Sequence, residues 1–491
     1  MTDQQNGSII RSESSNLSLA SLSGNPIASR MANDVLSRIN RHQTVEKRIL
    51  LGHYSFCEPD YRQITKWAQL INLHPLELLD IFEDTFCEAD KPFDSIRFEV
   101  HAGSITSLAW PSYVLGFLPN EWETGLRILS LGFCGSIVET LTLSGKELPH
   151  LEKLVCADSE LDALDIRHMH TLKHLDCRSN RLTFFDASSL SSLEVFSCEG
   201  NNLKELSLDS TLQLVHLDCG CNNLKELRLR STPQLSYLDC SGNNLEEINL
   251  EHAPCLLHLN CACNNLNELN LHSAPLLSHL DCSENSIEAI NLEHTPQLLH
   301  LNCDGNCLQD LRLDPVPLLS YLDCSYNNVL TINLEHTPQL LQLKCACNSL
   351  QDLRLDPVPL LSHLDFSHNY VDTINLEHTP QLLHLNCSSN SLEDLGLDAL
   401  LALKYLDCSN NKLTTLKLDY SSSLESLICS RNILAELDLE SVTRMTFLDC
   451  RNNRLPELCL YSVPPTLGYI CCKLNFMLEL KPDQPRDIVR V

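Results

Sequence analysis

A cysteine recurs at a fixed interval along most of this chain. The cysteines that stand 21 residues apart are Cys156, Cys177, Cys198, Cys219, Cys240, Cys261, Cys282, Cys303, Cys324, Cys345, Cys387, Cys408, Cys429, Cys450 and Cys471. Phe366 takes the one intermediate place, so fifteen of sixteen positions carry a thiol. A period this regular indicates repeated units that stack on one another, not a series of separate globular domains.

Aligned on this cysteine, each unit follows the pattern L-x-x-L-D/N-C-x-x-N-x-L-x-x-L-x-L, as in "LLHLNCACNNLNELNL" at 256–271. One unit alone cannot bury its leucine side, so neighbouring units must share a continuous core. Cysteine is small and commonly buried, which suits a tight inward position. The asparagine three residues later suits a turn, where its side chain can satisfy backbone groups of adjacent units. We therefore predict stacked coils with an inner cysteine ladder and an asparagine ladder at the turns.

The pattern resembles the leucine-rich repeat, and the resemblance covers about residues 126–475. Each unit divides into two similar halves, L-x-x-L-x-C-x-x-N-x-L and L-x-x-L-x-L, which is similar to the bacterial short-repeat subclass called IRREKO. The resemblance implies an α/β-type repeat solenoid, in which parallel strands form a curved array, and a bacterial origin. It also implies that outward residues beside the buried leucines of the first half line the concave face.

Four segments are expected along the chain. Residues 1–30 are rich in serine and lack a core, so we expect disorder, and they resemble the export signals of type III secretion effectors. Residues 31–125 show helical patterns in "NDVLSRINRHQTVEKRILL" and "YRQITKWAQLINLHPLELLDIFEDTF", with Pro75 placed to open a helix. We expect a helical domain there that caps the first coil. Residues 126–475 are the predicted solenoid, and residues 476–491 are a C-terminal cap and tail.

The cysteine ladder invites a disulfide or metal interpretation. Neighbouring side chains in register lie about 4.8 Å apart, whereas a disulfide needs Cβ atoms about 3.8 Å apart. Second cysteines occur at Cys221, Cys263 and Cys347, but they fall at the turn while their partners point inward, which suits a tetrahedral zinc site poorly. We expect reduced thiols, no metal and no cofactor.

Two outward columns of residues are predicted on the first half of each unit. They hold His or Tyr two residues before Asp or Asn. The candidate partner-binding residues in these columns are His216, Asp218, Tyr237, Asp239, His258, Asn260, His279, Asp281, His300, Asn302, Tyr321, Asp323, His363, Asp365, His384, Tyr405 and Asp407. We expect them to form a docking surface on the concave face, although a merely solvated face would contain the same residues.

The charge of the chain restricts its partners. The sequence holds 64 acidic and 35 basic residues, a formal charge of −29, and residues 231–343 carry fourteen acidic residues and one basic residue, Arg312. Such a surface repels nucleic acid and anionic lipid and attracts a basic protein or segment. Seven His in the first outward column would protonate near pH 6 and weaken this attraction.

A hydrolase is the alternative from another class. His279, Asp281 and Ser283 of "HLDCS" alternate along one strand, so they face the same way. Asp is the middle residue, however, whereas a base His should lie between the nucleophile and the Asp. Neighbouring units read YLDCS, HLNCS and HLDFS, so the trio follows from the strand register and is not specific. We expect no enzyme activity.

The sequence therefore favours a protein-protein interaction scaffold that binds a basic protein partner, with a secreted bacterial effector acting in a host cell as one setting. An intracellular bacterial regulator or adaptor stays open, and a hydrolase or metal-binding protein using the His and Asp columns is the least favoured reading. No signal peptide and no run of about 20 apolar residues is present, so a cytoplasmic location, or secretion into a host cytoplasm, is expected. The oligomeric state is not indicated.

Overall fold

A computed structural model describes residues 48–71, 73–84, 86–87, 96–102, 104–110, 122–123, 126–133, 139–458, 468–473, 475 and 479–480. Two compact units make up the chain, residues 1–202 and residues 203–491. The expectations for residues 1–30 lie outside the described residues, as does nearly all of the tail expected at 476–491.

The first unit begins with two helices among short strands. These elements are β1 (Arg48–Leu51), β2 (Tyr54–Cys57), α2 (Glu58–Leu70), α3 (Pro75–Glu83), β3 (Phe86–Cys87), β4 (Ile96–Arg97) and β5 (Glu99–His101). The helices predicted around "KWAQL" and after Pro75 are confirmed. The helical pattern extended to Leu51 is wrong at its end, because Arg48–Leu51 pairs antiparallel with Tyr54–Cys57 as a hairpin.

Local sequence explains where both helices begin. Helix α2 carries Pro59 in its first turn and buries Asp60, Ile64, Trp67 and Ala68, which share one helical face. Before helix α3, the backbone N–H of His74 donates to Glu77 Oε2 at 2.7 Å, while His74 Nδ1 accepts from the N–H of Leu76 at 3.2 Å. This reciprocal capping satisfies N–H groups that lack partners within the helix.

The helices cover the first strand of a parallel sheet. Trp67 of α2 lies 4.9 Å from Trp110 and 5.6 Å from Trp122 between ring centroids, in edge-to-face contacts. Asp60, which is fully buried, accepts a hydrogen bond from the backbone N–H of Ile105 at 2.9 Å through Oδ1. Ile105 belongs to β6, so helix α2 packs against the first coil, whose strand β6 also pairs antiparallel with β5.

The parallel sheet of the first unit starts earlier than predicted. Its strands are β6 (Ser104–Ala109), β7 (Ser130–Gly132), β9 (Lys153–Val155), β11 (His174–Asp176) and β13 (Val195–Ser197), with β8 (Thr140–Thr142), β10 (Ala163–Asp165) and β12 (Phe184–Asp186) in a second row. The N–H of Trp110 donates to Gly132 O, and that of Phe133 to Val155 O, as that of Cys156 does to Asp176 O. Trp110 and Phe133 thus hold the ladder position in two coils that lack the cysteine.

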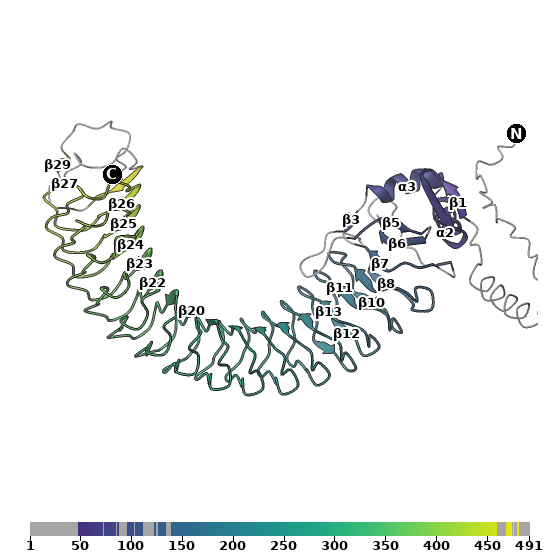
Figure 1. Cartoon of the computed structure of the whole chain (residues 1–491), viewed down its shortest axis with the longest axis horizontal. Coiled ribbons are helices and arrows are strands. Elements are labelled where there is room, and N and C mark those ends of the chain that lie inside the picture. Colours follow the sequence, from purple (N-terminus) through teal and green to yellow (C-terminus); the bar gives the residue numbers. More distant parts are fainter. Residues whose placement is uncertain are drawn as a thin grey trace, which may run out of the picture. The chain divides into compact units, whose positions relative to one another are not determined.

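The second unit continues the same design. The strands of its main sheet are β15 (His216–Asp218), β16 (Tyr237–Asp239), β17 (His258–Asn260), β18 (His279–Asp281), β19 (His300–Asn302), β20 (Tyr321–Asp323), β21 (Gln342–Lys344), β22 (His363–Asp365), β23 (His384–Asn386), β24 (Tyr405–Asp407), β25 (Ser426–Ile428), β26 (Phe447–Asp449) and β28 (Tyr469–Cys471). Strands β14 (Glu205–Ser207), β27 (Glu457–Leu458) and β29 (Glu479–Leu480) lie elsewhere. Each main strand pairs in parallel with the next, and Figure 1 shows them on the inner side of the curve of this unit.

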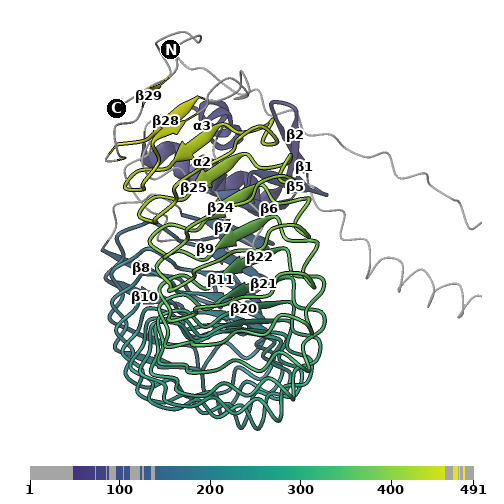
Figure 2. The same cartoon turned by 90° about the vertical axis from the view of Figure 1, so that its left-hand side faces the viewer.

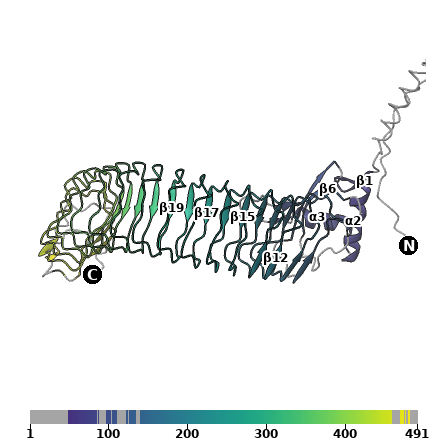
Figure 3. The same ribbon diagram turned by 90° about the horizontal axis from the view of Figure 1, so that it is seen from below.

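Side views show how the coils repeat. Figure 2 shows the strands from β20 onward one above another, and Figure 3 shows successive coils side by side from β15 to β19. In each of these coils the middle strand residue is buried, and so is the cysteine after the strand, or Phe366 in one coil; Leu280 and Cys282, for example, are both at 0% exposure. The predicted solenoid of parallel strands with an inner cysteine ladder is therefore confirmed.

The prediction that Cys471 belongs to the cysteine ladder is wrong. Asp449 pairs with Cys471 across the strands, so Cys471 takes the place of an outward Asp. Cys472 is the buried residue in the ladder position, and the amide of Asn475 donates to its carbonyl at 2.8 Å. This coil holds one residue more than the period of 21, which is why extrapolation of the period selected the wrong cysteine.

Candidate binding surface on the parallel sheet

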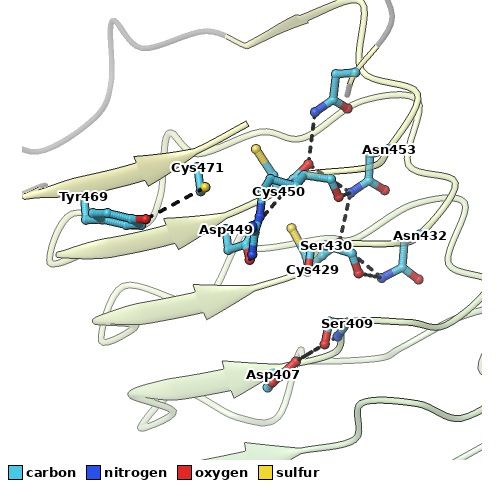
Figure 4. Close-up of polar contacts among 12 residues, drawn as sticks. Asp407, Ser409, Cys429, Ser430, Asn432, Asp449, Cys450, Asn453, Tyr469 and Cys471 are labelled. Carbon is cyan, nitrogen blue, oxygen red and sulfur yellow. Dashed lines mark hydrogen bonds and ion pairs between the residues drawn. The ribbon is translucent and has the colours of Figure 1, made fainter. Parts of the chain in front are cut away.

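The asparagine ladder fixes the turn after each strand of the main sheet from β11 to β28. Asn306 Nδ2 donates to the carbonyls of Cys282, Cys303 and Asp304 at 3.0, 3.2 and 3.2 Å. Its Oδ1 accepts from the N–H of Ile287 at 2.9 Å. Each asparagine thus joins two coils, and the predicted structural ladder is confirmed along the solenoid; Figure 4 shows Asn432 and Asn453 in the same role.

The cysteine ladder serves as core. Ladder thiols donate to carbonyls of the next coil, for example Cys282 Sγ to Asn302 O at 3.5 Å and Cys303 Sγ to Asp323 O at 3.3 Å. Burial raises the pKa of both thiols well above its usual value. By contrast, Cys221 and Cys263 are exposed and adopt the left-handed backbone conformation of a turn, as predicted.

The outward columns share one face of the sheet. All the predicted candidate residues occupy the first or third position of strands β15 to β24. In a strand these positions point the same way, opposite to the buried middle residue. The structure therefore brings the His/Tyr column and the Asp/Asn column together as two adjacent lines along the sheet.

The rings of the first column stack on one another. Ring centroids lie 4.2 Å apart for His216 and Tyr237, 4.2 Å for His258 and His279, and 4.1 Å for His300 and Tyr321, with interplanar angles of 9°, 18° and 2°. Looser contacts of 6.0 and 5.9 Å join these pairs into one run. A second run consists of His363, His384 and Tyr405. Gln342 separates the two runs, because it is the one member of this stretch without a ring.

The carboxylates of the second column are held by a repeated network. Asp281 Oδ1 accepts from the N–H and hydroxyl of Ser283 at 3.0 and 2.6 Å, and Asp281 Oδ2 accepts from Asn302 Nδ2 at 2.8 Å. Asn260 and Asn386 bind the Asp of the preceding coil in the same way. At the C-terminal end, Ser409 likewise donates to Asp407 at 2.6 Å (Figure 4). The alternation of Asp and Asn thus does more than separate charges, because it gives Asp239, Asp281 and Asp365 a donor on the next coil.

Four histidines in the first column, His216, His279, His300 and His384, resist protonation. Partial burial lowers the pKa of His216 to about 4, against a smaller opposing effect of Asp239. Burial also lowers the pKa of His300 and His384. In His279, burial and then the neighbouring His258 and His300 lower the pKa. The expectation that all seven histidines protonate near pH 6 is therefore wrong, because stacked and half-covered rings lose hydration that the charged form needs.

We expect the free energy of unfolding to fall between pH 6.5 and pH 4. The unfolded state binds a proton on His216 near pH 6.5 while the folded state binds it only near pH 4, so acidification favours unfolding. At pH 4.5 the contribution of His216 is about 2 kcal/mol. Urea unfolding at pH 7 and pH 4.5 should show this difference between the wild type and His216→Gln. An equal loss in both proteins would contradict a lowered pKa.

The His279, Asp281 and Ser283 trio does not have the arrangement of a hydrolase. Ser283 donates its hydroxyl proton directly to Asp281. His279 Nδ1 lies 2.9 Å from the hydroxyl of Ser278, which also lies 3.0 Å from Leu257 O. The serine that would be the nucleophile is therefore bound to the carboxylate and not to the base.

Other chemical features lie away from the columns. A depression of about 550 Å³ lies between two coils, at the second half of their repeat units. It is lined by Glu268, Asn270, His272, Ile290 and His294. Within the described part of the chain, no group of three or more His, Cys, Asp or Glu side chains is placed to hold a metal ion. No described helix is long and apolar enough to cross a bilayer.

Similarity to known proteins is found among solved structures. No protein-family model and no curated protein sequence matches the chain. Among solved structures, the functional domain of InlJ from Listeria monocytogenes, which includes a cysteine ladder, matches with 30% identity and a TM-score of 0.58. The match covers 58% of this chain and 64% of that structure, so it spans less than two thirds of the relative. The chain is a leucine-rich repeat solenoid.

Two further leucine-rich repeat structures are similar. YopM from Yersinia enterocolitica WA-314 is 28% identical, with a TM-score of 0.59 and coverage of 72% of this chain and 82% of that one. The Leptospira interrogans protein LIC12759 shares the fold at 19% identity and a TM-score of 0.57, covering 65% of this chain and 89% of its own. The solenoid of about 21 residues per coil and its cysteine ladder thus have counterparts in solved structures.

Sequence reasoning missed two features of the columns. The stacking of His on Tyr was not predicted, although both residue types recur at one repeat position, which was the available signal. The Asn-to-Asp bonds between coils were also missed, although the alternation of Asp and Asn from 239 to 407 pointed to pairs of coils.

Proposed function

We propose that this chain is a non-enzymatic scaffold that binds a basic protein segment on the outward columns of β15 to β24. The observation that carries the proposal is the row of fixed carboxylates Asp239, Asp281, Asp323, Asp365 and Asp407, one on every second coil. Across residues 237–407, Lys344 is the only cation seen paired with this row, at 3.4 Å from Asp323. The row therefore offers oriented negative charge along a line.

The hydrogen bonds around Asp239, Asp281, Asp365 and Asp407 leave room for a partner, whereas Asp323 is buried and already paired with Lys344. A carboxylate has about four acceptor sites, and Asp239 uses three of them, for Ser241 N–H, Ser241 Oγ and Asn260 Nδ2. An incoming Lys or Arg can take the remaining site on Oδ2 without breaking the network. A carboxylate held in place loses little conformational freedom on binding, and the adjacent rings supply flat contact area.

We expect a fluorescent lysine homopeptide of about 20 residues to bind the wild type and to bind at least tenfold more weakly when Asp239→Asn, Asp281→Asn and Asp365→Asn are combined. The tenfold loss of affinity is the combined effect of three lost ionic contacts, each of moderate strength. Asn already occupies the same column at position 260, so a side chain of this size fits, and the exchange costs the bond from the Asn of the next coil; circular dichroism verifies that the variant stays folded. Fluorescence anisotropy at low and high salt measures the affinity.

The control must match the change in net charge. The control variant combines Glu251→Gln, Glu293→Gln and Glu335→Gln, which removes three charges from exposed turns in the second half of the repeat unit. The backbone N–H of each Glu bonds to an Asn, so the turn does not need the carboxylate. If this control weakens peptide binding as much as the Asp variant, attraction is due to net charge alone and the proposed site is wrong.

We also propose that the scaffold is a secreted bacterial effector, with an intracellular bacterial regulator or adaptor as the alternative. Similarity to bacterial leucine-rich repeat structures from Listeria, Yersinia and Leptospira supports a bacterial setting. Fusion of residues 1–30 to a reporter in a bacterium with a type III secretion system separates the two, because only the effector requires export that depends on this segment.

A further inference from the structure

A zigzag line of exposed leucines precedes the stacked rings in the sequence. One leucine per coil, on six consecutive coils, stands one or three residues before the strand and is between 39% and 47% exposed. The residues are Leu257, Leu276, Leu299, Leu318, Leu341 and Leu360, and we name this line the leucine ribbon. In the same coils the repeat leucines, such as Leu259 and Leu280, are buried, so the ribbon is not part of the core.

The position of the exposed leucine alternates between two kinds of coil. Leu257, Leu299 and Leu341 directly precede a strand, and Ser278, Ser320 and Ser362 take this place on the alternate coils. Each of these serines donates its hydroxyl to the carbonyl of the leucine one coil before, at 3.0, 2.9 and 2.9 Å. On the serine coils, the exposed leucine stands two residues earlier. The alternation thus keeps one exposed leucine on every coil.

The charge around the ribbon selects the kind of partner. A long exposed apolar line marks an interaction site more often than ordinary surface. Residues 231–343, which hold most of the ribbon, carry fourteen acidic residues and one basic residue. This charge disfavours both an anionic bilayer and a second copy of the same chain, because like charges would approach each other. A basic protein segment is the complementary occupant.

We propose that the leucine ribbon and the row of carboxylates together dock an amphipathic, basic α-helix of a partner protein. This inference rests on the proposed function and specifies its partner. Parallel strands lie about 4.8 Å apart, and an α-helix rises about 5.4 Å per turn. Apolar residues at i, i+3 and i+7 are themselves staggered on the helix face, so they would meet the alternating leucines at about one per coil. Carboxylates on every second coil stand about 9.6 Å apart, close to the rise of about 10.5 Å over seven helical residues.

The width of the surface also fits a helix. Along one coil, Leu257, His258 and Asn260 place the ribbon, the rings and the Asp/Asn column within four residues. A stretch of this length spans about 10 Å, which is the diameter of a helix with its side chains. The apolar side of the helix would contact the ribbon, its basic edge would contact the carboxylates, and the rings would lie between them.

Two synthetic peptides of about 20 residues test the proposal. One places Leu at helical spacing with Lys along one edge, and the other contains the same residues in an order that has no apolar face. We expect the amphipathic peptide to bind the wild type at least tenfold more tightly and to gain helical circular dichroism on binding. Combined Leu257→Asn, Leu299→Asn and Leu341→Asn should remove this advantage.

A matched control changes exposed apolar residues of the same region that lie outside the ribbon. Tyr326→Asn, Leu330→Asn and Tyr370→Asn alter side chains that are 58% to 66% exposed, beyond the other end of the strands. This control should bind both peptides as the wild type does. Far-ultraviolet circular dichroism verifies that both triple variants stay folded, as expected for exposed positions.

The outcomes separate this inference from the proposed function. If the ribbon variant keeps the full preference for the amphipathic peptide while the Asp variant loses binding, the ribbon proposal is overturned and the carboxylate site stands. If the Asp variant binds both peptides normally, the proposed function itself is wrong. If sedimentation shows a dimer that the ribbon variant dissociates, the ribbon serves self-association and the helix-docking proposal is overturned.

Discussion

Replacing Asn306 by Ala is expected to lower the free energy of unfolding by about 3 kcal/mol, because four hydrogen bonds are lost at once and one of them leaves a buried N–H without an acceptor. The N–H of Ile287 loses its acceptor, and the carbonyls of Cys282 and Cys303 lose a donor. Asn306 is buried, so water cannot replace these bonds without opening the turn. Because coils contact only their neighbours, the loss should spread to the coils on both sides.

Urea unfolding followed by far-ultraviolet circular dichroism measures this effect. Asn291→Ala is the matched control, because Asn291 Oδ1 accepts only the exposed N–H of Glu293 at 3.0 Å, and its loss should stay within about 0.5 kcal/mol. Similar losses for the two variants would mean that the inner asparagines do not link the coils.

The part of the fold that could be predicted from sequence is the part that repeats. Cysteine, asparagine and leucine recur at fixed spacing because each fills the same environment in every coil, so the pattern reports buried and turn positions directly. The same regularity placed His279 and Asp281 outward. The pattern could not predict side-chain contacts between coils, such as the bond from Asn302 to Asp281. These contacts depend on the side-chain conformation, which the spacing of residues does not determine.

Prediction failed where the repeat ends. Trp110 and Phe133 take the ladder position 23 residues apart, so neither residue type nor spacing matched the cysteine pattern. Cys472 replaces Cys471 because the last coil is one residue longer. Arg48–Leu51 continued a helical pattern, yet pairing with Tyr54–Cys57 makes it a strand. Tertiary contacts decide structure at such places, and local propensity is weak there.

Trp67→Ala should produce the second large loss, about 3–5 kcal/mol in the first unit, which is the usual cost of truncating a buried tryptophan. Trp67 is 1% exposed and contacts Trp110, Trp122 and Phe82. Trp110 holds the ladder position of the first coil, so this cluster is what fastens helix α2 to the sheet. Its loss should also weaken the contact of helix α2 with β6, where Asp60 accepts a hydrogen bond from the N–H of Ile105.

Tryptophan fluorescence can measure the loss of stability in the N-terminal part. The chain contains three, all in this cluster, so in Trp67→Ala the fluorescence of Trp110 and Trp122 follows only the N-terminal part while circular dichroism follows the whole solenoid. We expect the fluorescence midpoint in urea to fall well below that of the wild type. Leu70→Ala, on the same helix but 64% exposed, should leave it unchanged. If Trp67→Ala also left the midpoint unchanged, the helices would not stabilise the first coil, and residues 48–84 would be an attached domain and not a cap.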